Sequence, residues 1–158
     1  MKFTVYTDGG CSGNKRDAGC NGAWAFLILD PSNTIIYQDV ALVANTTNNQ
    51  MEMMAVAQGV KFLKVVLDRH YGGAKMHDCT IISDSNYVVG NWTDYVPGWK
   101  RCGWRKSSGG VVANIELWKE IDSMSPEFKS FNLQWVKGHS TNKFNSEADA
   151  LVRSVLYT

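Results

Sequence analysis

Three runs rich in hydrophobic and β-branched residues occupy the first third of the chain. They cover residues 2–8, Asn21 to Leu29 and Thr34 to Val43, and Gly/Asn-rich or Asp-Pro-Ser-Asn segments separate them. Runs of this length, bounded by turn-forming residues, are typical of strands joined by reversals of the chain. The pattern therefore predicts an antiparallel meander of three strands.

The next segment changes to a helical pattern. Thr47 and Gln50 have the spacing of a capping box, and we expect the helix that they open to run to about Arg69, before Gly72 and Gly73. Its hydrophobic stripe recurs at helical spacing through Ala55, Val56, Gly59, Leu63 and Val66.

The rest of the chain alternates strand and helix. Residues 79–83 form an apolar run without polar alternation, which is typical of a strand covered on both faces, so we expect it to lie parallel to the first strand. After it we expect a short helix behind Asp84, an irregular Trp- and Lys/Arg-rich stretch from Trp92 to Gly110, a helix over Val112 to Met124, a strand over Phe131 to Val136 and a helix over Asn145 to Leu156. This order predicts an α/β fold with a five-stranded mixed sheet, three antiparallel strands and then parallel ones, flanked by helices. With 158 residues, 44% of them hydrophobic, we expect residues 1–158 to form one domain.

Composition narrows the class of protein. The N-terminus MKFTVYTDGG has too short an apolar run for a signal peptide, and no run of about 18 apolar residues occurs, so we expect a cytoplasmic protein that does not contact membranes. The net charge of +1 excludes a general affinity for polyanions, so nucleic-acid binding would require a local patch. The four cysteines form no Cys-x-x-Cys pair, and we expect reduced thiols.

Four carboxylates stand at positions where α/β folds gather their sites. Asp8 and Asp84 close β-rich runs before a turn or helix, and Glu52 and Asp149 fall in the first turns of predicted helices. Three of them also have a purely structural explanation. Asp8 could form a turn, Asp84 could cap a helix, and Asp149 could complete a capping box with Ser146.

Glu52 is the acid that local structure explains least, because it extends the hydrophobic stripe of its helix and so points towards the sheet. A carboxylate there is costly unless a positive group meets it. If the topology brings the four acids together, raised pKa values or bound cations must relieve their repulsion. An all-oxygen cluster suits Mg²⁺ or Mn²⁺ rather than zinc. Two such ions about 3.5–4 Å apart would support phosphodiester hydrolysis.

The stretch YVPGWKRCGWRK interleaves aromatic and basic side chains, and no acid occurs between Asp94 and Glu116. Basic groups attract phosphates and aromatic rings can face sugars or bases. The stretch therefore predicts nucleic-acid contacts by Tyr95, Trp99, Lys100, Arg101, Trp104 and Arg105. The alternative is a solvated charged loop held in place by core tryptophans. Separately, Thr47 and Asn48 begin the Glu52 helix, where free backbone N–H groups suit a phosphate in addition to capping.

The four acids, together with the segments TTNNQMEMMA and WVKGHS, resemble type 1 ribonuclease H over nearly the whole chain. The resemblance implies a ribonuclease H-like fold and a monomeric, Mg²⁺-dependent endonuclease, with Mn²⁺ as the alternative cation. Such an enzyme hydrolyses the RNA strand of RNA–DNA hybrids and leaves 5′-phosphate and 3′-hydroxyl ends. Metal binding is thereby assigned to Asp8, Glu52, Asp84 and Asp149.

The resemblance also assigns proton transfer or product departure to His139, which taken alone is a solvated surface histidine. It implies minor-groove contacts for Asn14, Asn49 and Asn86, a DNA-phosphate pocket at the start of the Glu52 helix, and a basic protrusion formed by the aromatic stretch. Contacts to 2′-hydroxyls would then select the RNA strand. Two other functions stay open, a non-catalytic hybrid-binding module and a transposase- or integrase-like nuclease on the same fold.

Overall fold

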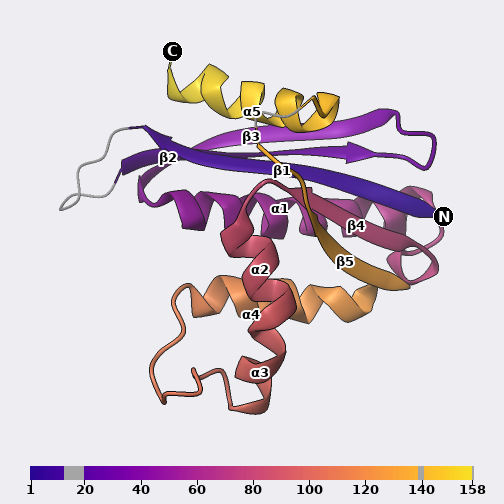
Figure 1. Ribbon diagram of the computed structural model, residues 1–158. Coiled ribbons are helices and arrows are strands. Elements are labelled where there is room, and N and C mark those ends of the chain that lie inside the picture. The colour runs from indigo at the N-terminus through magenta and orange to yellow at the C-terminus, as the bar shows by residue number, and fades with distance from the viewer. Residues whose placement is uncertain (13–19, 139–140, 158) are drawn as a thin grey trace.

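A five-stranded mixed sheet forms the centre of the computed structural model, which describes residues 1–12, 20–138 and 141–157 (Figure 1). Its strands are β1 (Lys2–Ser12), β2 (Cys20–Leu29), β3 (Ile35–Thr46), β4 (Asp78–Ser83) and β5 (Ser130–Trp135). They lie in the order β3-β2-β1-β4-β5. β2 pairs antiparallel with β1 and β3, whereas β4 pairs parallel with β1 and β5. The predicted mixed sheet is confirmed.

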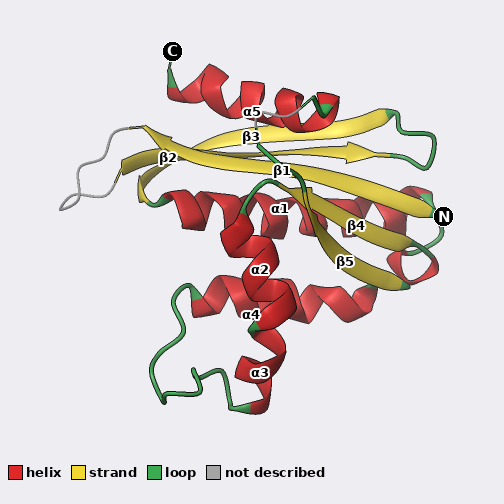
Figure 2. Ribbon diagram, viewed as in Figure 1, coloured by secondary structure: helices red, strands yellow, loops and turns green. Residues whose placement is uncertain are grey.

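Helices cover both faces of this sheet. Figure 2 shows α5 on one face and α1 on the other, with α4 beyond α1 and with α2 and α3 on the same side as α4. None of the helices that the structure describes is long and apolar enough to span a membrane. The helices are α1 (Asn48–His70), α2 (Asn86–Asp94), α3 (Val96–Arg101), α4 (Ile115–Met124) and α5 (Lys143–Leu156), with short 3-10 turns η1 (Ala74–Met76) and η2 (Ser125–Glu127).

Helix α1 lies close against the sheet through its predicted stripe. At Gly59 the approach is close enough that a Cβ there would come within 2.7 Å of Val5 Cγ1. Thr47 caps the helix by accepting a hydrogen bond from the Gln50 backbone N–H at 3.1 Å. The Gln50 side chain accepts from the Thr46 hydroxyl instead of returning to Thr47, so the predicted capping box is half formed. The stripe itself is buried as predicted, at Ala55, Val56, Gly59, Leu63 and Val66.

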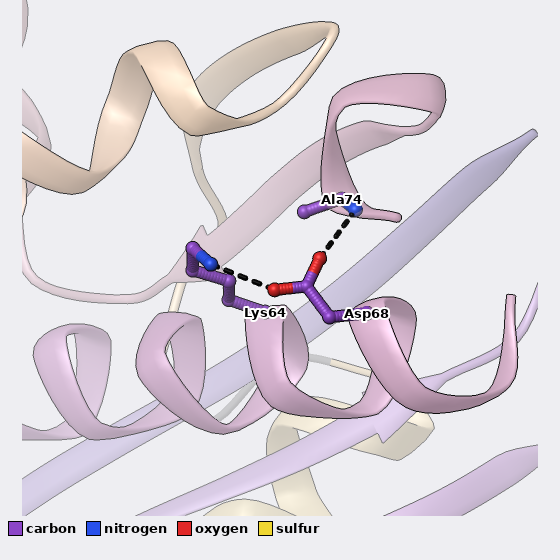
Figure 3. Close-up of polar contacts among 3 residues, drawn as sticks. All are labelled: Lys64, Asp68 and Ala74. Carbon is purple, nitrogen blue, oxygen red and sulfur yellow. Dashed lines mark hydrogen bonds and ion pairs between the residues drawn. The ribbon is translucent and has the colours of Figure 1, made fainter. Parts of the chain in front are cut away.

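Asp68 fixes the exit from α1 (Figure 3). One carboxylate oxygen lies 2.7 Å from Lys64 Nζ, and the other accepts a hydrogen bond from the Ala74 backbone N–H at 2.9 Å. The hydrogen bond from Lys64, followed by that from Ala74, holds the pKa of Asp68 below its ordinary value. The carboxylate therefore ties the last turns of α1 to η1, from which the chain enters β4.

The structure corrects some predicted boundaries. Residues 92–110 are not irregular throughout, because their first residues end α2 and a further helix, α3, follows. Helix α4 begins at Ile115 rather than Val112, and α5 begins at Lys143 rather than Asn145.

Cys11 and Cys20 form a disulfide, which corrects the prediction that the cysteines are reduced. The two residues lie on β1 and β2, and the hairpin brings their Cα atoms to 5.8 Å, within the range that a disulfide spans. The sequence could not show this pairing because it depends on how the two strands align. Of the other two cysteines, Cys79 is free and buried and Cys102 is free and exposed.

Candidate active site

Asp8 and Asp84 come from neighbouring strands. β1 and β4 pair in parallel as far as Thr7 and Ser83, so the next residue of each segment is one of these acids. β4 ends there, but β1 continues to Ser12 because it remains paired with β2. The prediction that Asp8 closes its strand is therefore wrong, and so is the alternative of Asp8 as a turn former. The structure nevertheless places both acids where the parallel pairing ends.

The side chain of Asp84 is not used as a helix cap. Ser85 caps α2, since its hydroxyl accepts a hydrogen bond from the Val88 backbone N–H at 3.1 Å. Trp135, the last residue of β5, donates from its indole Nε1 to the Asp84 carbonyl at 3.1 Å. These contacts fix the backbone at Asp84 and leave its carboxylate free to face the other acids.

Glu52 reaches the same place from the first turns of α1. Gly9, next to Asp8, lies beneath the start of this helix, and a Cβ on Gly9 would overlap the backbone of Met51 and Glu52. The missing side chain lets α1 begin directly against β1. As a result Glu52, which is 8% exposed, is buried beside the strand that carries Asp8.

The structure brings the four predicted acids together at one site. Asp8, Glu52 and Asp84 each offer a carboxylate oxygen, and these three atoms lie within 4.8 Å of one another. Asp149 stands outside this tightest group but lines, with Asp8 and Asp84, a cavity of about 400 Å³. Three acids thus form a compact cluster, and the fourth faces it from α5.

Burial and mutual repulsion make two acids of the cluster, Asp8 and Glu52, hard to ionise. Burial, followed by the charges of Asp84 and Asp149, raises the pKa of Asp8 to about 8. The pKa of Glu52 lies well above its ordinary range, again mainly because of burial and then because of Asp8 and Asp84. In addition, Glu52 Oε1 is buried and has no hydrogen-bond partner among the described residues. A cation bound in the cluster would stabilise the ionised forms of Asp8 and Glu52 and would give Glu52 Oε1 a partner.

The donor set fits a hard divalent cation. Carboxylate oxygens are the ligands that Mg²⁺ and Mn²⁺ prefer in proteins. Within the described part of the chain, the cluster includes neither cysteine nor histidine. A buried carboxylate oxygen without a partner is rare in folded proteins, and a cation at Glu52 Oε1 would supply the missing partner.

Asp149 is not part of a capping box with Ser146. The side chain of Asn142 caps α5 instead, by accepting hydrogen bonds from two backbone N–H groups of the first turn. Asp149 therefore lies in the second turn, where it faces the cavity and has Arg153 Nη1 at 3.9 Å from its Oδ2. Arg153 also lines the cavity and is absent from the sequence predictions, although its i, i+4 spacing from Asp149 could have indicated it.

The residues predicted to meet a phosphate or the minor groove lie on the surface near the cavity. Thr47, Asn48 and Asn49 are exposed at the start of α1, and Asn48 lines the cavity itself. Asn86 is the exposed first residue of α2, two positions after Asp84. The structure thus gathers four of the predicted substrate contacts around the two helix starts that flank the acids.

Two predicted site residues, Asn14 and His139, lie outside the described residues. The residue before His139 is described, and a Cβ on this Gly138 would stand 3.2 Å from Asp84 Oδ2. The segment WVKGHS therefore reaches Asp84 immediately before His139.

The aromatic residues of the predicted protrusion serve the core as well as the surface. Trp99 and Trp104 are partly buried against the main core, as the alternative of core tryptophans predicts. Tyr95 is 58% exposed and stacks on Trp99 with ring centroids 6.0 Å apart. A groove of about 330 Å³ runs beside this pair, lined by Asn91, Tyr95, Trp99, Lys106, Ser107 and Ser108.

The basic residues of the protrusion differ in whether they already form an ion pair. Arg101 and Arg105 are exposed, and neither forms an ion pair with a described residue. Lys100 pairs with Asp122 of α4, with 2.9 Å between Nζ and Oδ1. A phosphate contact by Lys100 would have to replace this ion pair, which the sequence did not reveal.

Comparisons of the sequence with known proteins point to one family. The family model described as RNase H matches residues 1–157. Ribonuclease H of Wolbachia sp. subsp. Drosophila simulans (strain wRi) is 38% identical over 157 residues, which are 98% of this chain and 95% of that protein. Ribonuclease H of Ehrlichia canis (strain Jake) is 39% identical over 153 residues, covering 97% of this chain and 93% of that protein.

Solved structures show the same fold. The crystal structure of LC9-RNase H1, a type 1 RNase H with the type 2 active-site motif, superposes with a TM-score of 0.78 at 26% identity and covers 98% of this chain and 72% of that one. LC11-RNase H1 in complex with an RNA/DNA hybrid gives a TM-score of 0.71 at 20% identity, over 96% of this chain and 94% of that one. At the lower identity the likeness concerns the fold alone.

Proposed function

Because this chain belongs to the ribonuclease H family and is a ribonuclease H enzyme by that membership, we propose that it cuts the RNA strand of RNA–DNA hybrids with the help of divalent cations. The observation that carries the proposal is the cluster of Asp8, Glu52 and Asp84, in which a buried Glu52 oxygen has no partner within the described residues. A protein without metal chemistry has no use for such a cluster, because it repels itself and resists ionisation.

The carboxylates of Asp8, Glu52, Asp84 and Asp149 are the residues that would hold Mg²⁺, with Mn²⁺ as the alternative. When bound there, two ions would supply an activated water and would stabilise the leaving oxygen in phosphodiester hydrolysis, with 5′-phosphate and 3′-hydroxyl products. The protein's own contribution is to fix the ligands. Parallel pairing of β1 and β4 sets Asp8 beside Asp84, and the contact at Gly9 sets Glu52 against both.

We assign proton transfer or product departure to His139. The support for this role is the position of Gly138, the residue before His139, because a Cβ on Gly138 would stand 3.2 Å from Asp84 Oδ2. A histidine titrates near neutral pH and can accept and release a proton there. Replacement of His139 by Ala would slow turnover by roughly 10²- to 10⁴-fold if it acts as a general acid or base.

Substrate binding combines a phosphate site with a minor-groove contact. Thr47 and Asn48 offer the N-terminus of α1 to a DNA phosphate, since this helix has free backbone N–H groups there. Asn14, Asn49 and Asn86 would read the minor groove, where 2′-hydroxyls distinguish RNA from DNA. The exposed Tyr95, Arg101 and Arg105 of the protrusion would hold the DNA strand. Lys100, which is exposed but paired with Asp122, and the partly buried Trp99 and Trp104 would support them.

Two further points belong to this proposal. We propose that residues 1–158 form one catalytic domain, because the acids come from segments spread over nearly the whole sequence and lie at one site. We also propose that this domain acts as a monomer. We also propose that the enzyme acts in the cytoplasm.

A panel of labelled duplexes tests the proposal. The protein is incubated, with and without Mg²⁺, with each of four substrates, which are hybrid, duplex DNA, duplex RNA and a DNA duplex that contains a short run of ribonucleotides. We expect Mg²⁺-dependent cuts in the hybrid and within the ribonucleotide run, because several adjacent 2′-hydroxyls are contacted together. Binding of the hybrid without cleavage would favour a non-catalytic module, and efficient cutting of duplex DNA would favour an integrase-like nuclease.

A further inference from the structure

Arg153 is the single lysine or arginine among the described residues that line the carboxylate cavity. It stands one helical turn after Asp149, and its Nη1 lies 3.9 Å from Asp149 Oδ2. The preceding residue, Val152, is buried against Ala23 and Ala25 of β2. This packing fixes α5 on the sheet and thereby sets the side from which Arg153 reaches the cavity.

The contact with Asp149 leaves most of the guanidinium free. The Arg153 side chain is 65% exposed, and it makes no other ion pair with a residue that the structure describes. A separation of 3.9 Å is long for a charge-assisted hydrogen bond, and exposed pairs of this kind contribute little to stability. A guanidinium has five N–H donors, so Arg153 can bind a second anion at the cavity entrance.

The charge of the cavity indicates which anion this is. The carboxylates of Asp84 and Asp149 line the cavity and repel a nucleic-acid backbone until cations neutralise them. Once they are neutralised, a backbone phosphate can enter, and the planar fork of an arginine matches two phosphate oxygens. Arg153 then lies beside a phosphate rather than beside an unshielded carboxylate.

We propose that Arg153 is a substrate-binding residue, which exchanges its contact with Asp149 for a backbone phosphate of the nucleic acid at the cavity entrance. The proposal rests on the proposed hybrid nuclease function. It has a second consequence, because the positive charge of Arg153 opposes the binding of cations by Asp149. Arg153 should therefore strengthen the binding of nucleic acid and weaken the binding of metal.

The test compares Arg153→Ala and Arg153→Lys with the matched control Arg69→Ala. Arg69 is exposed in the last turn of α1, so the control removes the same charge from another helix. We expect Arg153→Ala to raise KM for the hybrid roughly 10-fold with a much smaller change in kcat. The slope of log KM against log salt should decrease by about 0.7–0.9, the share of one phosphate contact. Arg153→Lys should keep the slope and recover part of KM, and Arg69→Ala should match the wild type.

A calorimetric titration of the free protein with Mn²⁺ provides the second readout. Arg153→Ala should bind Mn²⁺ about twofold or more tightly, as expected when a nearby positive charge is removed. The proposal would be overturned if Arg153→Ala kept the wild-type KM and salt dependence, or if this variant bound Mn²⁺ more weakly. Either result would mean that Arg153 only orients Asp149. If the wild type cuts no hybrid, the proposed function fails separately. Fluorescence anisotropy of a labelled hybrid over the same salt series then decides the role of Arg153.

Discussion

The backbone of Gly9 lies so close to the first turn of α1 at Glu52 that no side chain fits between them. Gly9 follows Asp8 on β1, and Glu52 lies five positions after the N-cap of α1. A single backbone contact therefore sets the distance between two of the three carboxylates in the cluster. Both the stability of this region and its chemistry depend on that contact.

Replacement of Gly9 by Ala should damage stability and activity together. The added Cβ would overlap the backbone of Met51 and Glu52, so the start of α1 must move. We expect a loss of about 1–3 kcal/mol in the free energy of unfolding, measured by urea denaturation, and a large loss of hybrid cleavage. Gly10→Ala is the control, because its Cβ would meet Val152 Cγ1 at an ordinary 3.5 Å. Equal stability of the two variants would contradict this account of the contact.

Stability without metal should fall as the pH rises. The pKa of Asp8 is raised from 3.8 to about 8 in the folded protein, so the folded state holds this proton more tightly than the unfolded state. The resulting stabilisation is complete below the unfolded pKa and is lost as the pH rises through the folded pKa. In EDTA, Tm should therefore fall by several degrees between about pH 5 and about pH 9.

Asp8→Asn and added Mg²⁺ provide the controls for that pH dependence. The Asn variant carries no ionisable group at this position, so its Tm in EDTA should fall less and exceed that of the wild type at the alkaline end. Mg²⁺ should restore the wild-type Tm at high pH, because the ion binds the ionised cluster. A wild-type Tm in EDTA that is independent of pH over this range would refute the raised pKa.

Reduction of the Cys11–Cys20 bridge should destabilise the protein. The two cysteines are nine residues apart, and for a loop of that length the loss of the cross-link costs about 2–3 kcal/mol in the chain-entropy account. The double variant Cys11→Ser/Cys20→Ser should show this loss and should no longer respond to reductant in urea denaturation. Cys102→Ser should keep the wild-type response, because this exposed thiol is free. A wild type that is insensitive to reductant would mean that the bridge contributes nothing.

The basic protrusion should bind through its arginines more than through Lys100. Arg101 and Arg105 are exposed, whereas the Lys100 ammonium is already paired with Asp122. Arg101→Ala/Arg105→Ala should raise KM and lower the salt slope by about one to two, with little change in kcat. Lys100→Ala should change the slope less. A salt slope equal to that of the wild type in the double variant would show that the protrusion does not hold the hybrid.

The sequence predicted the features that local patterns encode. The order of strand and helix signals was enough for the mixed sheet, and the buried stripe of α1 correctly placed Glu52 towards the sheet. The apolar run before Asp84 indicated a strand parallel to β1, which accounts for Asp8 and Asp84 lying at the end of one parallel pair. These inferences need only periodicity and the geometry of parallel strands.

What the sequence missed depends on contacts between distant segments. The Cys11–Cys20 bridge follows from the β1–β2 hairpin, and the Lys100–Asp122 pair follows from the packing around α4. Continuation of β1 past Asp8 requires β2 beside it, which no local pattern shows. The position of Arg153 in the cavity likewise depends on how α5 lies across the sheet, so only its spacing from Asp149 was visible beforehand.

Metal-dependent cleavage of the RNA strand is tested with a hybrid labelled on both strands, which is incubated in Mg²⁺ with the wild type and with Glu52→Gln. Gln keeps the shape of Glu52 but removes a charged oxygen from the cluster. We expect the wild type to cut the RNA strand and to leave the DNA strand intact. We expect Glu52→Gln to lose turnover by about 10³-fold, the scale of the stabilisation that bound cations supply, while it still binds the hybrid. Turnover of Glu52→Gln close to that of the wild type would show that the carboxylate cluster is not the catalytic site, and cutting of the DNA strand by the wild type would rule out a hybrid-specific ribonuclease.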